Sequence, residues 1–505
     1  MMSLDKFTSS VTTGYTFNGK YITLGTSVFE KSAVKNLQVK VPLTSINRHG
    51  LIAGATGTGK TKSLQNFAES LSENGISVLM MDIKGDLSGI AKQGTENPKI
   101  AERHQLIGSE WKASSFPTEL LTISNETGVR MRATVSEFGP VLFSKILELN
   151  DNQAGVVAIV FKYADEKQLP ILDIKDFRKI LQHLSNEGKA EIKDNYGAIS
   201  PATANVILRK LIELETQGAE VFFGETSFEV EDLVRKDSTG KGYINILRLV
   251  DVQDKPKLFS TFMLCLLAEV YQKFPEVGDK AEPKLVIFID EAHLIFNEAS
   301  KELLNQLETI IKLIRSKGVG IYFCTQQPTD IPDAVLGQLG LKIQHALRAF
   351  TAKDRKAIKL VAENYPESEF YKVDELITEL GIGEAFVTVL NEKGIPTPLV
   401  HTLMCAPRSR MDVLSPEEQK ELIANSRLAD IYNKEVDRES AYEMLNKKIE
   451  SATINKEIEE TAPAKKASTK AEPSFIEQAS KNAIVKSVVK EVTRGLFGML
   501  FGKRR

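Results

Sequence analysis

The chain has 505 residues, of which 42% are hydrophobic and 26% are charged, as in an ordinary globular protein with one large domain or several smaller ones. A formal net charge of −2 excludes a protein that holds nucleic acid through a strongly basic total, although it does not exclude one whose cations line a pore. Cys265, Cys324 and Cys405 are far apart and show no CxxC spacing, which predicts reduced thiols in a cytoplasmic protein.

The beginning of the chain favours short strands. Residues 1–45 are predicted as a β-rich segment, because Thr, Val, Tyr and Phe are punctuated by Gly and Asn from residue 11 onward. The opening residues, "MMSLDKFTSSVTTGYTF", lack the apolar run of a signal peptide. No stretch of about 18 uncharged apolar residues follows anywhere, so no membrane-spanning helix is expected.

From residue 50, strands and helices alternate. "GLIAGA" predicts a strand, 60–73 a helix and "ISVLMMDI" a second strand, a rhythm that indicates a parallel sheet with helices on both faces. After residue 240 the rhythm returns, with strands predicted over 242–249, 284–291, 320–326 and 342–350 and helices over 257–273 and 298–317. We therefore predict an α/β core formed by residues 46–94 and 241–406.

Three further segments are predicted outside this core. Residues 95–240 interrupt the rhythm and predict a mainly helical insertion, in which "FRKILQHLSNEG" and "SPATANVILRKLIELETQG" both end on glycine. Residues 407–451 predict a charged helix. Residues 452–473 contain almost no large apolar residue, so they are predicted to be a flexible linker.

Residues 474–505 predict a basic amphipathic helix at the end of the chain. Its seven Lys and Arg against two Glu give a local charge of +5. Such a helix suits docking to a protein partner, a membrane surface or nucleic acid, and it suits equally well packing on the protein's own core or on a neighbouring subunit. The apolar stripe consists of Ile484, Val485, Val488, Val489, Val492 and Leu496.

The stretch "GATGTGKT" predicts a phosphate-binding loop. It matches the Walker A pattern GxxxxGK[ST] and lies between an apolar strand and a helix, where backbone N–H groups and the helix N-terminus attract phosphate. Lys60 is expected to reach the β- and γ-phosphates of ATP, and the Thr61 hydroxyl is expected to bind Mg²⁺. The predicted nucleotide-binding residues of the loop are Gly54, Ala55, Thr56, Gly57, Thr58, Gly59, Lys60 and Thr61.

The stretch "KLVIFIDEAH" predicts the second half of the site. Its apolar residues form a buried strand that brings Asp290 to the sheet edge where ligands bind, and Asp290 is expected to hold the Mg²⁺ hydration shell. Glu291 is predicted to take a proton from an attacking water, a role that favours hydrolysis over phosphate transfer. Alternatively, Glu291 caps the strand end or pairs with a lysine.

"FCTQQP" ends another predicted strand. Gln326 is positioned there to orient water or to sense the γ-phosphate. A polar residue between a strand and a proline is also commonplace, so Gln326 by itself does not decide between a catalytic and a purely local role.

With these motifs in family order, the chain resembles the HerA/FtsK superfamily of P-loop ATPases, and more closely its bacterial HerA-like branch, the YjgR-type proteins. The resemblance covers roughly residues 35–405. It rests on "NRHGLIAGATGTGKT", "MMDIKGDLSGIA", "LVIFIDEAH", "IRSKGVGIYFCTQQPTDIPDAVLGQLG" and "KIQHALRAFTAKD". It implies a RecA-like core, a homo-hexameric ring with ATP at its subunit interfaces, and double-stranded DNA or polypeptide as the cargo of relatives.

The same resemblance implies roles for further residues. Gln326 matches the polar residue that ends the strand after the Walker B strand. Asp82 matches an acidic position beside the nucleotide. Arg315 matches an arginine that senses the neighbouring subunit's nucleotide. Unlike HerA itself, this sequence has too few residues before the core for a full N-terminal β-barrel, so DNA as the cargo is inferred from relatives only.

Arg48 matches an arginine that relatives insert into the adjacent subunit's site. It precedes the Walker A strand, and a strand of six residues spans about 20 Å, so Arg48 is too far from its own phosphate loop to act in cis. It is therefore either a finger for the next subunit or a solvated charge at the start of a strand.

Two functions of different classes follow from these patterns. The first is an ATP-hydrolysing ring motor that acts on DNA, as a translocase or helicase. The second is an ATP-dependent switch or scaffold that acts on a protein partner and moves nothing. A small-molecule kinase is disfavoured by Glu291 and by the absence of a recognisable acceptor site.

Overall fold

A computed structural model describes residues 3–193, 195–278, 282–298, 301–436 and 438–461. The chain divides into two compact units. Among the described residues, the core unit takes those within 3–132, 217–222 and 226–435, and the helical unit takes those within 133–216, 223–225 and 436–461.

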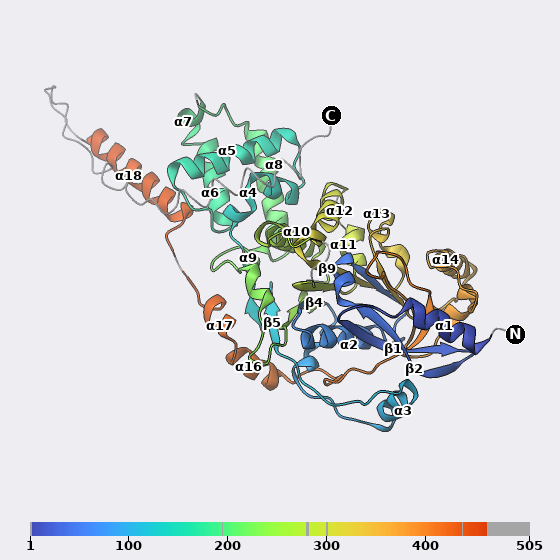
Figure 1. Cartoon of the computed structure of the whole chain (residues 1–505). Coiled ribbons are helices and arrows are strands. Elements are labelled where there is room, and N and C mark those ends of the chain that lie inside the picture. Colours follow the sequence, from blue (N-terminus) through green and yellow to red (C-terminus); the bar gives the residue numbers. More distant parts are fainter. Residues whose placement is uncertain (1–2, 194, 279–281, 299–300, 437, 462–505) are drawn as a thin grey trace. The chain divides into compact units, whose positions relative to one another are not determined.

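The core unit is built on one 12-stranded sheet with the order β2-β1-β12-β11-β10-β3-β9-β8-β4-β7-β5-β6 (Figure 1). The strands from β10 to β6 in this order run parallel, whereas β11, β12, β1 and β2 pair antiparallel. The predicted α/β class is thereby confirmed. The strands are β1 (Tyr21–Phe29), β2 (Ser32–Pro42), β3 (Gly50–Ala53), β4 (Ser77–Asp82), β5 (Thr118–Thr122), β6 (Val129–Arg130), β7 (Ile244–Arg248), β8 (Leu285–Ile289), β9 (Val319–Thr325), β10 (Leu341–Gln344), β11 (Glu384–Thr388) and β12 (Val400–Met404).

Helices cover both faces of the parallel region, which is why its strands are apolar throughout. Successive side chains of β9 point to opposite faces. Tyr322 packs against Phe67 of α2 (Lys60–Glu73), with ring centroids 5.2 Å apart. Phe323 packs against Phe296 of α11 (His293–Glu298), at 5.5 Å. The other core helices are α3 (Pro98–Ile107), α9 (Ala219–Phe222), α10 (Pro256–Lys273), α12 (Lys301–Ile314), α13 (Asp333–Leu336), α14 (Ala352–Glu363) and α15 (Val373–Glu379).

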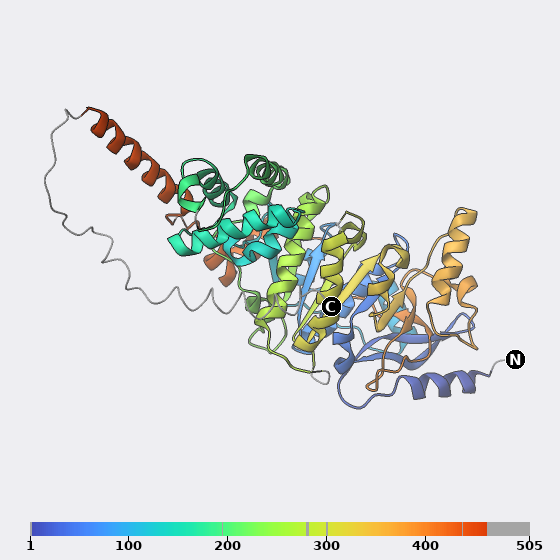
Figure 2. The ribbon, with the colours of Figure 1, turned by 90° about the horizontal axis from the view of Figure 1, so that it is seen from above.

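The N-terminal segment differs from the all-strand prediction for residues 11–45. It begins with a helix, α1 (Leu4–Gly14), whose N-cap Ser3 accepts a hydrogen bond from the Asp5 N–H. Phe7 and Val11 recur at helical spacing and are buried, with the Phe7 ring 4.9 Å from Phe29 of β1. Helix α1 therefore lies against the β1–β2 hairpin (Figure 2), and β1 joins the main sheet through β12.

The predicted insertion over residues 95–240 is narrower in the structure. Strands β5 and β6 lie inside that range yet belong to the core sheet, because Leu120 and Leu121 of β5 pair with Ile246 and Leu247 of β7. The helical unit takes only the middle of the range, with Phe143 and Phe177 in its core at a centroid distance of 5.0 Å. Its helices there are α4 (Val135–Ile146), α5 (Asp151–Lys167), α6 (Ile174–Ser185), α7 (Lys189–Lys193) and α8 (Pro201–Thr216).

The predicted single helix over residues 407–451 is divided into α16 (Pro416–Ala424), α17 (Arg427–Tyr432) and α18 (Ala441–Thr461). Ser415 and Ser426 cap the first two helices, and each cap starts a new helix. Helix α18 extends over the first part of the predicted 452–473 linker, since Pro463 is the first helix-breaking residue that follows. The rest of that linker and the predicted helix over 474–505 lie outside the described residues.

Within the described parts of the chain, every helix is too short or too polar to cross a membrane.

Candidate functional site

The predicted phosphate loop connects β3 to α2 at the carboxyl edge of the parallel strands. Gly54 has a φ of 154°, and a Cβ on it would lie 2.5 Å from the Cβ of His345, so only glycine fits there. Gly59, with a φ of 107°, is the N-cap of α2. The Thr58 hydroxyl donates to the Ala55 carbonyl at 2.7 Å, which closes the loop on itself. The loop is thus shaped by its glycine conformations, by the Thr58 hydrogen bond and by the close approach of His345.

Lys60 is folded back over this loop. Its Nζ donates to the Gly54 carbonyl at 2.5 Å and to the Ala55 carbonyl at 3.2 Å, and the side chain is buried. Burial, followed by the nearby charge of Lys84, lowers the pKa of the Lys60 ammonium. The negative charge of a phosphate at the loop would offset both effects, so the position suits a phosphate-binding lysine.

Asp290 and Glu291 follow β8 at the same edge of the sheet. Both side chains are buried, and burial raises the pKa of Asp290 to about 6. Glu291 has a φ of 47°, which is a strained value for a residue other than glycine. Strain of this kind is frequent at functional sites, where the surrounding structure holds one side chain in a required place.

Lys84 contacts Glu291 directly, which the sequence did not single out. Lys84 Nζ lies 2.5 Å from Glu291 Oε1, and the two side chains are 38% and 8% exposed. The pKa of Lys84 is raised, because the hydrogen bond to Glu291 and the charge of Asp290 outweigh the opposing effect of burial. The alternative that Glu291 pairs with a lysine is therefore observed. The sequence did contain a signal for this contact. Lys84 lies two residues after β4, and β4 pairs with β8, the strand that Glu291 follows.

Asp82 is bonded to its own turn. Its Oδ1 accepts hydrogen bonds from the N–H groups of Gly85 and Asp86, at 2.8 and 3.1 Å, and its Oδ2 accepts one from Leu87 at 3.2 Å. Burial raises the pKa of Asp82 to about 7. This carboxyl group shapes the turn that presents Lys84, and its predicted contact with nucleotide stays a prediction.

Gln326 is exposed at the end of β9 and lines a pocket that also contains Ala55 of the phosphate loop. The predicted strand over 342–350 stops at Gln344, and the residues that follow form another wall of this pocket. The walls include the apolar side chains of Leu347 and Phe350, and Phe350 is 86% exposed. Gln326 thus lies near the phosphate loop, in a position open to a ligand or to another chain.

Arg48 lies at the opposite edge of the sheet, where β3 begins. It ends the 3₁₀ helix Leu43–Arg48, and its guanidinium is half-buried beside Gly394. Among the described residues, no side-chain hydrogen bond or ion pair engages this guanidinium. Strand β3, which separates Arg48 from the phosphate loop, has four residues and alone spans about 13 Å. The structure therefore does not bring Arg48 and Lys60 of one chain together.

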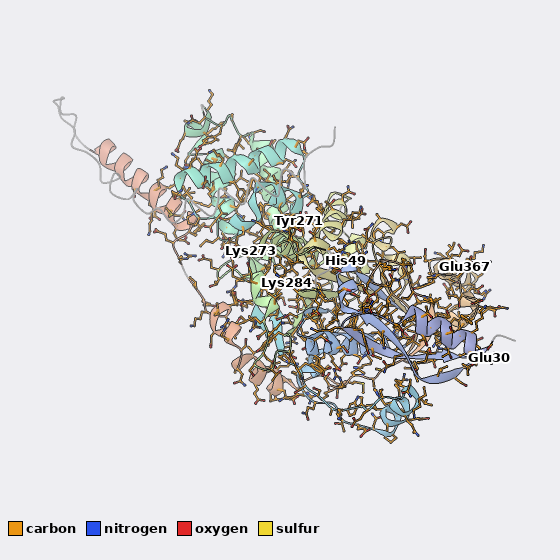
Figure 3. The ribbon with its side chains drawn as sticks, in the orientation of Figure 1. Glu30, His49, Tyr271, Lys273, Lys284 and Glu367 are labelled. Atoms are coloured by element: carbon orange, nitrogen blue, oxygen red, sulfur yellow. The ribbon has the colours of Figure 1, made fainter. Side chains whose placement is uncertain are left out.

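His49, next to Arg48, has a structural role. Its Nε2 donates to the Ile311 carbonyl at 2.8 Å, and its Nδ1 accepts the Ile321 N–H at 3.0 Å, so the buried ring is neutral. Figure 3 labels the His49 side chain. Burial, with a smaller contribution from the charge of Arg315, lowers the pKa of His49 to about 4. Arg315, which follows α12, is therefore on the Arg48 side of the sheet and not beside the chain's own phosphate loop.

We expect His49→Asn to be less stable than the unmodified protein at pH 7.5, and this difference to shrink by about 2 kcal/mol at pH 5. The unfolded chain, with an ordinary histidine pKa near 6.5, binds more protons than the folded chain between pH 6.5 and 4. The stability contributed by His49 is therefore present above pH 6.5 and lost as the pH falls. Denaturant unfolding at both pH values measures it, and a constant difference would contradict the assignment.

The residues beside the phosphate loop, at the carboxyl edge of the parallel strands, fit a magnesium ion. Magnesium in nucleotide sites takes one or two protein oxygens and completes its shell with water and phosphate. Asp290 supplies a buried carboxylate at the end of β8, and Thr61 supplies a hydroxyl in the first turn of α2. Among the described residues, no three or more His, Cys, Asp or Glu side chains are grouped so that they could hold a metal ion.

Comparisons with known proteins agree with this arrangement. Residues 28–505 match the family described as "Helicase HerA-like C-terminal". The chain is 23% identical over 379 residues to the DNA double-strand break repair helicase HerA of Saccharolobus solfataricus, which covers 70% of this chain and 64% of that protein. It is 20% identical over 367 residues to the protein of the same name from Sulfolobus acidocaldarius, covering 72% and 66%. The chain thus spans less than two thirds of the length of these relatives.

A solved structure shows a similar fold. The unbound form of the bacterial conjugative coupling protein TrwBdeltaN70 matches with a TM-score of 0.50 and 14% identity, over 81% of this chain and 94% of that one. At this identity the likeness concerns the fold alone.

Proposed function

This chain belongs to the HerA-like C-terminal helicase family, and from that premise we propose that it is an ATP-hydrolysing motor that works on double-stranded DNA as a homo-hexameric ring. One observation supports this most directly: Lys60 and the Asp290–Glu291 pair meet at the carboxyl edge of the parallel strands of one sheet. The names of the relatives support DNA as the cargo. The proposal includes membership of the bacterial, YjgR-type branch.

In the proposed reaction, the chain's own residues hold ATP and move one proton. The loop N–H groups and Lys60 bind the β- and γ-phosphates, and Thr61 and Asp290 hold Mg²⁺, which neutralises phosphate charge. Glu291 takes a proton from water while the water oxygen bonds to the γ-phosphorus. The bond from that phosphorus to the bridging oxygen breaks, and its electron pair leaves with ADP.

The neighbouring subunit would complete the site. The guanidinium of Arg48, which has no hydrogen-bond or ion-pair partner among the described residues, lies at the sheet edge away from its own phosphate loop, as an arginine that acts on another chain requires. Arg315 is on that side as well. Gln326 and Asp82 would act within the chain, Gln326 on the attacking water and Asp82 beside the nucleotide.

ATP turnover with and without double-stranded DNA, measured together with the mass in solution, tests this proposal. We expect a particle of roughly six times the 56.0 kDa chain mass, with a turnover that rises when DNA is added. A ring whose turnover ignores DNA would instead favour the ATP-dependent switch or scaffold that acts on a protein partner. A monomer that ignores DNA would contradict the motor altogether.

A further inference from the structure

The contact between Lys84 and Glu291 joins two neighbouring strands at the proposed catalytic edge. β4 and β8 are parallel and in register, with Met81 opposite Ile289, so the residues that follow them emerge side by side. The Asp82 turn, with its three backbone hydrogen bonds, fixes the backbone that carries Lys84. The 2.5 Å contact therefore joins two anchored backbone segments, from which an exposed lysine side chain reaches a buried glutamate.

The two oxygens of Glu291 have different surroundings. Oε1 is held by Lys84. Oε2 is buried and makes no hydrogen bond within the described structure, and His293 Nδ1 lies 3.3 Å from it. His293 makes no hydrogen bond with Oε2, so the lone pairs of Oε2 remain available. One oxygen is thus anchored and the other remains able to accept a proton.

We propose that Lys84 is a positioning residue for ATP hydrolysis, which anchors Glu291 through Oε1 and leaves Oε2 as the oxygen that takes the proton. This inference rests on the proposed function, and it adds a residue to which none of the matched sequence motifs gave a role. Lys84 does not itself touch the reacting atoms in this assignment. Its effect on turnover passes through Glu291.

The burial of Glu291 explains why the anchor matters. A surface ion pair contributes little, because water solvates either partner equally well. A carboxylate that is 8% exposed has little water to replace a lost cation, so it would take up a proton or swing out of place. Either change removes the general base. Nucleotide binding would be spared, because Lys60 and Thr61 are on a different segment.

The test compares Lys84→Gln, Lys84→Arg and a matched control, Lys92→Gln. Lys92 is 46% exposed on the same connection after β4, and its acidic partner Glu421 is 4.0 Å away. For Lys84→Gln we expect kcat to fall roughly 10- to 100-fold with the Kd for ATP changed less than about threefold. Lys84→Arg should recover most of the loss, since it restores the cation, and Lys92→Gln should match the unmodified protein.

Thermal unfolding provides a measurement that does not depend on activity. Lys84→Gln should lower Tm in the unmodified protein, but much less in a Glu291→Gln background, where no buried charge loses its partner. Equal losses in both backgrounds, an unchanged kcat, or a loss of ATP binding in Lys84→Gln would each overturn the inference. If the unmodified protein fails to hydrolyse ATP, the proposed function is wrong and this inference with it; if only the Lys84 results fail, the proposed function stands.

Discussion

Glu291→Gln is expected to bind ATP as the unmodified protein does and to lose hydrolysis, with kcat lower by about 10²- to 10⁴-fold. The amide occupies nearly the same volume as the carboxylate, so the strained backbone at this position has no new group to accommodate. An amide cannot take a proton from water at neutral pH. Binding is expected to survive because the phosphates are held by the loop and Lys60, which Glu291 does not contact.

Phosphate release under saturating ATP, together with the Kd for a fluorescent ATP analogue, measures both halves of this expectation. Glu282→Gln is a suitable control, since Glu282 precedes the same strand and its side chain is 43% exposed beside Lys20. Equal turnover in Glu291→Gln and in the unmodified protein would mean that another group accepts the proton.

Arg48→Ala is expected to lower kcat by about 10³-fold in assembled rings, the effect typical of an arginine finger. Its guanidinium has no partner among the described residues, and its removal leaves no buried acid uncompensated. The fold of the subunit should therefore be unaffected, as a thermal melt would check. The loss should appear only where two subunits meet.

Mixing Arg48→Ala with Lys60→Ala subunits distinguishes action on the neighbour from action within the chain. Each variant alone has no complete site, because one lacks the finger and the other lacks the phosphate lysine. In randomly mixed rings about a quarter of the interfaces join an intact loop to an intact arginine, so part of the activity should return. Replacing the second partner by the Lys60→Ala/Arg48→Ala double variant removes every complete interface and should abolish the recovery. No recovery in the first mixture, with rings intact, would make Arg48 an ordinary surface charge.

The fold class was predictable from the sequence, and so was the position of the proposed phosphate loop between a strand and a helix, because both are encoded in short segments. A parallel strand that is buried on both faces must be apolar throughout. The apolar run in "KLVIFIDEAH" is therefore recognisable without knowing which strands lie beside it. Gly54, Lys60 and Thr61 are recognisable by spacing alone, since one turn and the first residues of one helix hold them all.

Other features depended on pairings between distant segments. Strand β5 was hidden within a predicted helical insertion, because five residues that pair with β7 more than 100 positions away leave no periodic signal. The predicted strand over 342–350 ended early at Gln344, and the residues beyond it turned aside to line the pocket near Gln326. The local residue pattern predicted that a strand forms there but did not predict the residue at which the strand ends.

The sequence by itself determined that this protein has a parallel α/β core with a Walker-type loop and an acidic pair at one strand end. Tertiary structure alone decided what surrounds these groups. It placed Lys84 2.5 Å from Glu291 and turned His49 into a buried bridge between Ile311 and Ile321. It also placed Arg48 at the opposite edge of the sheet, with no hydrogen-bond or ion-pair partner in the part of the chain that the structure describes. The physical reason is that spacing within one segment reveals what its own backbone presents, whereas charge partners and burial arise only when strands from distant parts of the chain lie side by side.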